Sequence, residues 1–288
     1  VSRVRNADVV MFMAEGRLRG NDPLYYGNRL MMLPFLAATQ FGKEILSLNQ
    51  TVALGNSKTF PGILFNVFRQ FRYVAFREPV SVRFFQENGF DEAVLFPDSA
   101  FRTQPSSKTL PELVTPAPQK RLLGITGSEE YDHEYRMEYL KMLCDYANRN
   151  QLQVCGLFWK PRWIKSLEEA HAAVGGPPPV FPVRGADYRD IARILAESAL
   201  LIGGRYHTSM KAATVHTPFV ALPSATHKTQ GLLEMLEWPF EERAFNDFPG
   251  MIADMDRILA DREALAEHLQ QAMLRIEDIR QKQIRLLG

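Results

Sequence analysis

Apolar and polar positions along the chain follow two alternating periods. Short runs of consecutive apolar residues, such as Val9–Met13, Tyr73–Phe76 and Leu200–Ile202, are typical of buried strands in a parallel sheet. Between these runs lie longer stretches whose apolar residues recur every three or four positions, a spacing that predicts helices. Strands that alternate with helices in this way predict an α/β fold, with parallel sheets covered by helices.

The rhythm is interrupted once, and this interruption predicts two domains. Residues 104–120 hold Pro105, Pro111, Pro116 and Pro118 among Ser, Thr and Lys, which is typical of an extended linker. We therefore predict a Rossmann-like domain over residues 1–103 and a second one over residues 121–288 that ends in a long amphipathic helix. The first domain opens on a strand with no initiating Met, so we expect it to be incomplete. Ligands of such sheets bind beyond the carboxyl ends of the strands, and with two facing domains the cleft is the expected site.

Composition narrows the class of protein. The 288 residues are 46% hydrophobic, enough for a substantial core, and the formal net charge of +1 gives no reason to expect a nucleic-acid partner. Cys144 and Cys155 lie in apolar patterns without metal-ligand spacing, so we expect buried thiols and a reducing compartment. No apolar run approaches the roughly 18 residues that span a bilayer, and no signal peptide opens the chain. These features predict a cytoplasmic protein and leave open attachment to the inner face of the membrane.

One strand–turn–helix segment combines several features that bind anions. The apolar run Leu200–Ile202 leads into Gly203 and Gly204, where the backbone can turn sharply and approach a ligand closely. Thr208 and Ser209 then open a helix, whose first N–H groups and partial positive charge favour an anion. Their hydroxyl groups add further donors.

The same turn carries a cation and an imidazole. Arg205 can bind a phosphate or carboxylate through two parallel hydrogen bonds, and His207 can exchange a proton near neutral pH. A strand–glycine–helix junction also occurs without any site, an arginine at a strand end commonly forms a salt bridge, and a lone histidine is commonly structural. Sequence chemistry alone leaves both interpretations open.

A second candidate loop follows the next predicted strand. Ser224, His227 and Lys228 supply a hydroxyl, an imidazole and an amine just before another predicted helix. Because parallel strands end at the same edge of a sheet, we expect this loop to line the same pocket as the Gly203 turn. A lysine at a helix start can equally be a solvated surface residue.

Several segments resemble the polysaccharide pyruvyl transferase family, in order along the chain. These segments are Val74–Ser81, which contains Arg-Glu-x-x-Ser, then Phe96–Phe101, Glu197–Ser209, Thr217–Ser224 and His227–Glu234. The resemblance implies two Rossmann-like domains in a GT-B arrangement. It also implies transfer of pyruvate from phosphoenolpyruvate to a sugar or lipid-linked glycan acceptor, with no cofactor and no metal. It assigns Arg205 to the phosphate or carboxylate of phosphoenolpyruvate and His207 to acid–base chemistry.

Other positions are candidates by the same resemblance. Arg77 is expected to contact a ligand or to cap its own sheet edge, and Glu15 is expected to act as a base for a sugar hydroxyl or to form a loop salt bridge. In relatives the strand that opens the second domain often ends in Arg, whereas here it reads Gly124-Ile125-Thr126-Gly127-Ser128. Candidates to replace this cation are Arg77, Lys160, Arg162 and Lys228. The alternatives are a nucleotide-sugar glycosyltransferase of the same fold and a catalytically inactive scaffold.

Overall fold

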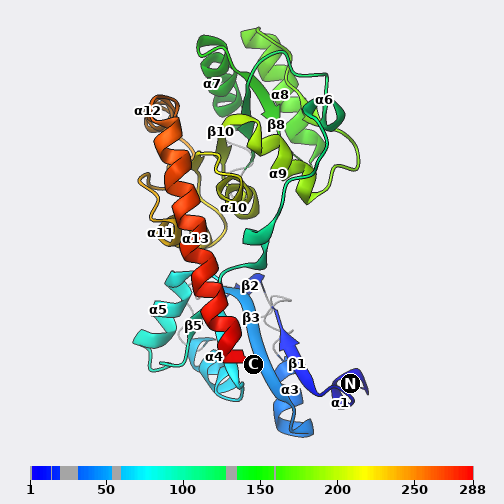
Figure 1. The fold of residues 1–288 in the computed structure, drawn as a ribbon, viewed down its shortest axis with the longest axis vertical. Coiled ribbons are helices and arrows are strands. Elements are labelled where there is room, and N and C mark those ends of the chain that lie inside the picture. Colours follow the sequence, from blue (N-terminus) through cyan, green and yellow to red (C-terminus); the bar gives the residue numbers. More distant parts are fainter. Residues whose placement is uncertain are drawn as a thin grey trace. The chain divides into compact units, whose positions relative to one another are not determined.

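The computed structural model describes residues 2–13, 15–19, 32–53, 60–127, 135–158 and 160–287. The chain divides into two compact units that we consider separately (Figure 1). Unit 1 contains Val1–Ser99, Thr226–Gly231 and Ile276–Gly288, and unit 2 contains Ala100–Ala225 and Leu232–Arg275. The first division is close to the predicted boundary at residue 103. Neither unit is continuous in sequence, because two segments from the second half of the chain belong to unit 1.

Unit 1 is built on a parallel sheet. Among its described residues five strands pair, in the order β1-β3-β4-β5 with β2 also on β3. The strands are β1 (Val9–Phe12), β2 (Glu15–Arg19), β3 (Glu44–Ala53), β4 (Tyr73–Phe76) and β5 (Val94–Leu95). The helices are α1 (Ser2–Arg5), α3 (Met32–Phe41), α4 (Phe60–Phe68) and α5 (Pro79–Glu87), with the short 3₁₀ helix η1 (Ser99–Arg102) beginning where unit 1 ends.

The core of unit 1 is rich in phenylalanine. The rings of Phe76 on β4 and Phe85 on α5 lie with centroids 4.5 Å apart, and Phe68 on α4 lies 5.4 Å from Phe85. All three side chains are fully buried. These contacts attach α4 and α5 to the sheet and thereby fix the start of α5, where the next subsection locates a cluster of polar side chains.

Glu15 begins a strand that the apolar pattern does not predict. This strand, β2, pairs with β3 in parallel register, with Glu15 opposite Gln50. Leu18 explains the extra strand, because its side chain is completely buried against the core. β3 is ten residues long, so β1 pairs with its first half and β2 with its second half.

Unit 2 holds a second parallel sheet. Four of its described strands pair in the order β11-β10-β7-β8. They are β7 (Leu122–Ile125), β8 (Gln153–Gly156), β10 (Ser198–Gly203) and β11 (Phe219–Ala221), and every residue of all four is buried. The helices are α6 (Leu110–Leu113), α7 (Arg136–Arg149), α8 (Pro161–Val174), α9 (Tyr188–Ala196), α10 (Tyr206–Thr214), α12 (Phe248–Ala260) and parts of α11 (Lys228–Leu236) and α13 (Arg262–Leu287).

The segment predicted as an extended linker is partly ordered within unit 2. It contains α6 and the strand β6 (Val114–Thr115), which pairs antiparallel with β9 (Phe181–Pro182). Thr109 caps α6 in a reciprocal arrangement with Glu112, so the proline-rich stretch encodes a short helix as well as a connection.

Two expectations, the fold class and the burial of the cysteines, are confirmed. The fold is α/β with parallel sheets, as the alternating pattern predicts. Cys144 and Cys155 are buried free thiols, and burial raises their pKa values to about 11 and about 12. In the part of the chain that the structure describes, no helix combines the length and apolar character needed to cross a bilayer.

Candidate functional site

The Gly203 turn ends β10 in close contact with β7. A Cβ atom on Gly203 would lie 2.7 Å from the carbonyl oxygen of Thr126 and would also collide with the Thr126 hydroxyl. The φ angle of Gly203 is +154°. Position 203 therefore requires glycine, because any side chain would push apart the carboxyl ends of the two neighbouring strands.

These two strand ends form the switch point of the unit 2 sheet. From β7 the chain goes to β8 on one side, and later returns as β10 on the opposite side of β7. The strand order thus reverses between β7 and β10, where Thr126 and Gly203 are located. Open parallel sheets bind their ligands beyond the carboxyl ends of the strands at such a point.

A small pocket lies at this edge and carries two cationic side chains. Its lining is Gly127, Leu157, Phe158, Lys160, Trp163 and Arg205. Arg205 is half-buried at the N-cap of α10, and Lys160 is half-buried at the N-cap of α8. Four cations are candidates to replace the missing strand-end arginine. Of these, Lys160 is found with Arg205 among the described residues that line the pocket.

Aromatic packing shapes one wall of this pocket. Trp163 is buried and its ring stacks on Phe158, with centroids 5.1 Å apart and planes 27° from parallel. A Cβ atom on Gly127 would lie 2.5 Å from the nearest atom of the Trp163 ring. The lack of a side chain at Gly127 therefore makes room for the indole ring of Trp163, and a larger residue at position 127 would displace that ring.

The first turn of α10 contains three further predicted site residues, and none of them is among the described residues that line the Arg205 pocket. Thr208 and Ser209 both donate their backbone N–H groups to the Arg205 carbonyl, at 2.8 and 3.0 Å. Ser209 is buried, Thr208 is half-buried, and His207 is exposed. His207 is not among the described residues that line the Arg205 pocket, so its role in proton transfer remains a prediction.

The second predicted loop is divided between the units. Ser224 is buried and belongs to unit 2, whereas Thr226–Gly231 belongs to unit 1. We expected His227 and Lys228 to line the pocket of the Gly203 turn. The contacts of His227 instead lie with the residues after β4, which explains the grouping with unit 1.

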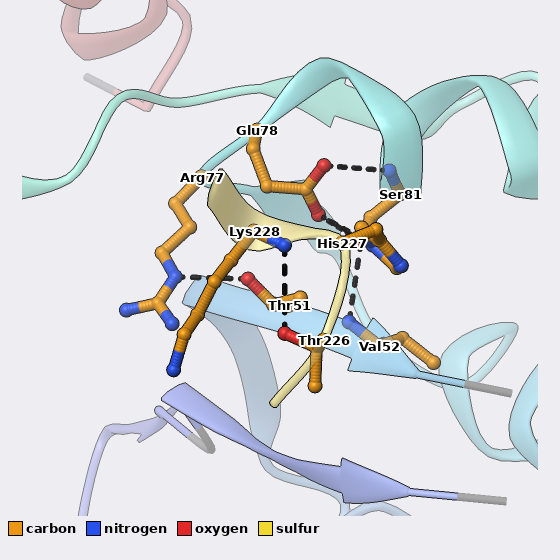
Figure 2. A network of polar contacts seen from close by, with 8 residues as sticks. All are labelled: Thr51, Val52, Arg77, Glu78, Ser81, Thr226, His227 and Lys228. Atoms are coloured by element: carbon orange, nitrogen blue, oxygen red, sulfur yellow. Dashed lines mark hydrogen bonds and ion pairs between the residues drawn. The ribbon is translucent and has the colours of Figure 1, made fainter. Parts of the chain in front are cut away.

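Those contacts form a compact polar cluster around a buried carboxylate (Figure 2). Glu78 is completely buried, and its Oε2 accepts the Ser81 backbone N–H at 3.0 Å, which caps the start of α5. Its Oε1 lies 3.2 Å from His227 Nε2 and also accepts the Ser81 hydroxyl. Ser81 Oγ lies 3.1 Å from His227 Nε2 and accepts the Val52 N–H at 3.2 Å.

Arg77 lies next to this cluster with its side chain turned into unit 1. It is 1% exposed, and its Nε donates to Thr51 Oγ1 at 2.9 Å. Its Nη1 is 3.2 Å from Asp98 Oδ2, and Asp98 is 2% exposed. Of the two expectations for Arg77, these contacts match the one in which it caps its own sheet edge.

Lys228 and Glu15 complete the predicted set. Lys228 is half-buried at the first position of α11, where its backbone N–H faces Thr226 Oγ1 at 3.5 Å. Glu15 pairs through its backbone with β3, and its side chain lies outside the described set. Among the described residues, no group of three or more His, Cys, Asp or Glu side chains is arranged to hold a metal ion.

A comparison with family models gives one match. The model described as "Polysaccharide pyruvyl transferase" matches residues 2–226. The chain belongs to the polysaccharide pyruvyl transferase family. A search of curated proteins by sequence finds no match.

Several solved structures are similar to this chain, and the names of three of them mention UDP or a UDP-sugar. The Neisseria meningitidis UDP-GlcNAc 2-epimerase bound to UDP-GlcNAc has a TM-score of 0.61 and 9% identity, over 96% of this chain and 76% of that chain. The Anabaena HepE protein in complex with UDP and glucose has a TM-score of 0.63 and 12% identity, over 99% and 79%. An α,α-trehalose-phosphate synthase from Burkholderia xenovorans has a TM-score of 0.57 and 13% identity, over 89% and 72%. The two units of this family member therefore have the α/β fold found in GT-B enzymes.

The sequence pattern does not mark Glu78 and Ser81 as site candidates. Both belong to the Arg-Glu-x-x-Ser segment that resembles the family. The available signal was an acidic residue before Pro79, with Ser81 three positions later, directly after the buried strand β4. Such spacing indicates a helix N-cap, but only the fold brings His227 to the same carboxylate.

Proposed function

We propose that this chain transfers a pyruvyl group from phosphoenolpyruvate to a sugar of a polysaccharide or glycan precursor, forming a pyruvate ketal and releasing phosphate. The observation that carries the proposal is the pocket of unit 2, where Arg205 and Lys160 line the switch point of the parallel sheet. Membership of the pyruvyl transferase family supports the class of reaction. In this proposal the acceptor is a sugar or lipid-linked glycan at the cytoplasmic side of the membrane.

The two cations suit the charge of the donor. Phosphoenolpyruvate carries a phosphate and a carboxylate, and is a trianion when fully ionised. The planar guanidinium of Arg205 can bind either group through two parallel hydrogen bonds, while the ammonium of Lys160 adds a compact charge. The N-terminus of α10, where Arg205 is the N-cap, adds a favourable partial positive charge.

The reaction needs protons to move in both directions. An acid delivers a proton to the methylene carbon, a sugar hydroxyl attacks the neighbouring carbon, and its proton passes to a base. The bond to phosphate breaks, and a second sugar hydroxyl attacks the same carbon and closes the ring. One of the two hydroxyl protons replaces the proton given to carbon, and the other leaves on hydrogen phosphate. His207, exposed on the first turn of α10, is our candidate for the acid.

The test is phosphate release by the full chain with phosphoenolpyruvate and a panel of sugar acceptors. Release that requires both substrates is the expected result. Arg205→Met and Lys160→Met should each raise the KM for phosphoenolpyruvate by about 10–100-fold, since a charged hydrogen bond contributes about 1.5–3 kcal/mol. Lys165→Met is the matched control, because Lys165 lies on the same helix with a side chain that is 78% exposed and pairs with Glu169.

The competing activity is transfer from a nucleotide sugar. The structures with the same fold include proteins bound to UDP or UDP-GlcNAc, so UDP-sugars belong in the donor panel. Turnover of a UDP-sugar with phosphoenolpyruvate left intact would overturn the proposal. Absence of turnover with every donor would instead favour an inactive scaffold.

A further inference from the structure

Three helices of unit 2 begin at the carboxyl edge of its sheet, and each brings a cation. Lys160 is the N-cap of α8, and Arg205 is the N-cap of α10. The first residue of α7, the helix that follows β7, is Arg136. The backbone N–H groups at these helix starts add partial positive charge. Lys160 and Arg205 line the pocket, so the place of Arg136 decides whether a third cation acts there.

Arg136 lies on the buried face of α7. The residues three, four and seven positions after it are Tyr139, Leu140 and Leu143, and all three are completely buried. The Tyr139 hydroxyl lies 3.5 Å from the carbonyl oxygen of Thr126, the residue that follows β7. Arg136 itself is half-buried. The sequence therefore places an arginine on the apolar stripe of this helix, at the end next to the switch point of the sheet.

The ring of Trp163 connects Arg136 to the pocket. The Arg136 guanidinium carbon, Cζ, lies over this ring, 5.8 Å from its centroid. Trp163 is 2% exposed and is one of the residues that line the pocket with Arg205 and Lys160. Arg136 thus lies against the same indole that forms a wall of the pocket, and the contact is a cation–π interaction.

A second arginine on α7 has the same kind of ring contact away from the pocket. Arg149, at the other end of the helix, has its guanidinium carbon 5.8 Å from the centroid of the Tyr146 ring. Its side chain is 55% exposed, and its Nε lies 3.0 Å from Asp145 Oδ2. Tyr146 is not among the described residues that line the pocket. The two arginines therefore share a contact type and differ in burial and in their distance along α7 from the switch point.

We propose that Arg136 is a third cation of the donor pocket and that Trp163 is the residue that positions it. The inference rests on the proposed function and deepens it, because it gives the trianionic donor a third positive charge. Arg136 is not itself among the described residues of the lining, so it acts by its charge from behind the Trp163 ring. Water screens a half-buried charge less than an exposed one, so this charge acts over several ångströms.

Equilibrium binding tests the charge without turnover. The Kd for phosphoenolpyruvate is measured on the full chain by isothermal titration calorimetry, with no acceptor present. Arg136→Met removes the charge and keeps an aliphatic side chain on the ring, so Kd should rise by about tenfold or more. Arg136→Lys keeps the charge, and its Kd should stay within about threefold of the wild type. Arg149→Met is the matched control, because it removes a ring contact and a charge at the far end of α7, and it should leave Kd unchanged.

Two further variants keep the test decisive. If Arg136→Met does not fold, as judged by thermal denaturation, Arg136→Gln takes its place, since Gln is neutral and still donates hydrogen bonds. It should raise Kd by about tenfold as well, and a wild-type Kd would overturn the role of the charge. If Trp163 positions Arg136, Trp163→Leu should weaken binding less in the Arg136→Met background than in the wild type. Additive effects would overturn the positioning.

The outcomes separate this inference from the proposed function. A wild-type chain that binds phosphoenolpyruvate and releases phosphate with an acceptor, while Arg136→Met stays within about threefold in Kd, would overturn the role of Arg136 alone. A Kd in Arg136→Lys as high as in Arg136→Met, or an equal loss in Arg149→Met, would also overturn it, because charge at this position would not be the cause. A wild-type chain that neither binds phosphoenolpyruvate nor consumes it with any acceptor would overturn the proposed function, and this inference with it.

Discussion

The buried ion pair of unit 1 offers a quantitative test of how Arg77 is used. Arg77 and Asp98 are 1% and 2% exposed, and Nη1 lies 3.2 Å from Oδ2. Thr51 accepts a further hydrogen bond from Arg77 Nε at 2.9 Å. The perturbation is Asp98→Ala, which removes the carboxylate and leaves the guanidinium in a site closed to water.

The expected cost follows from this burial. Removing one partner of a buried pair typically costs about 3–5 kcal/mol, because the remaining charge is uncompensated. A domain is stable by only about 5–15 kcal/mol, so the change is a large part of the total. The double variant Arg77→Met/Asp98→Leu removes both charges. Its cost should be about 1 kcal/mol, from the hydrogen bond lost at Thr51.

The assay must report on unit 1 rather than on the whole chain. Trp163 and Trp238 lie in unit 2, so tryptophan fluorescence follows the other unit. Hydrogen exchange of peptides that cover β3 and β4, measured by mass spectrometry in increasing urea, reports the local free energy of unfolding. A loss of less than about 1 kcal/mol in Asp98→Ala would refute a strongly stabilising buried pair, since that is the range of an exposed pair.

Two further predictions concern backbone geometry and pH in unit 2. Gly203→Ala should lower the free energy of unfolding by about 1–3 kcal/mol through overpacking. Gly124→Ala in the neighbouring strand should change it much less, because a Cβ atom there would meet nothing closer than 3.4 Å. Equal effects of the two variants in urea titrations followed by tryptophan fluorescence would contradict the contact with Thr126. Burial lowers the pKa of His216, which has φ +58°, so the folded state binds fewer protons than the unfolded state and loses stability as pH falls below about 6.5. His216→Asn, which also tolerates positive φ, should therefore lose less stability than the wild type between about pH 7 and pH 5, and an unchanged pH dependence would show that His216 is not the cause.

Local sequence patterns predicted the helices and strands whose own residues carry a strong periodic or apolar signal. β4 matches the predicted run Tyr73–Phe76 to the residue, β10 contains the predicted run Leu200–Ile202, and α13 is the long amphipathic helix predicted at the end of the second domain. Each has a continuous apolar run or a long helical period, so neighbours along the chain carry the signal. β2 has no such signal: Leu18 is the one apolar side chain in Glu15–Arg19, and the strand forms because the second half of β3 pairs with it.

The candidate site shows the same difference between signals that lie within one segment and contacts between distant segments. The Gly203 turn and Arg205 could be found from sequence, because strand, glycines and helix start are consecutive. Lys160 could only be named among several cations, since its place beside Arg205 depends on the order of strands in the sheet. The contact between Glu78 and His227 joins residues 149 positions apart and could not be read from either segment alone.

The charges of the two units match the two substrates that the proposal requires. In unit 2 the pocket residues Arg205 and Lys160 suit an anionic donor, whose affinity depends on cations. In the polar cluster of unit 1, Arg77 is already paired with the buried carboxylate of Asp98, and the buried carboxylate of Glu78 lies against His227, with Lys228 next to it in the sequence. Such a cluster suits a neutral hydroxyl that must lose a proton better than it suits a trianion. If phosphoenolpyruvate were instead bound by unit 1, Arg77→Met/Asp98→Leu would raise its KM by tenfold or more, whereas the burial of Arg77 predicts a change within about threefold.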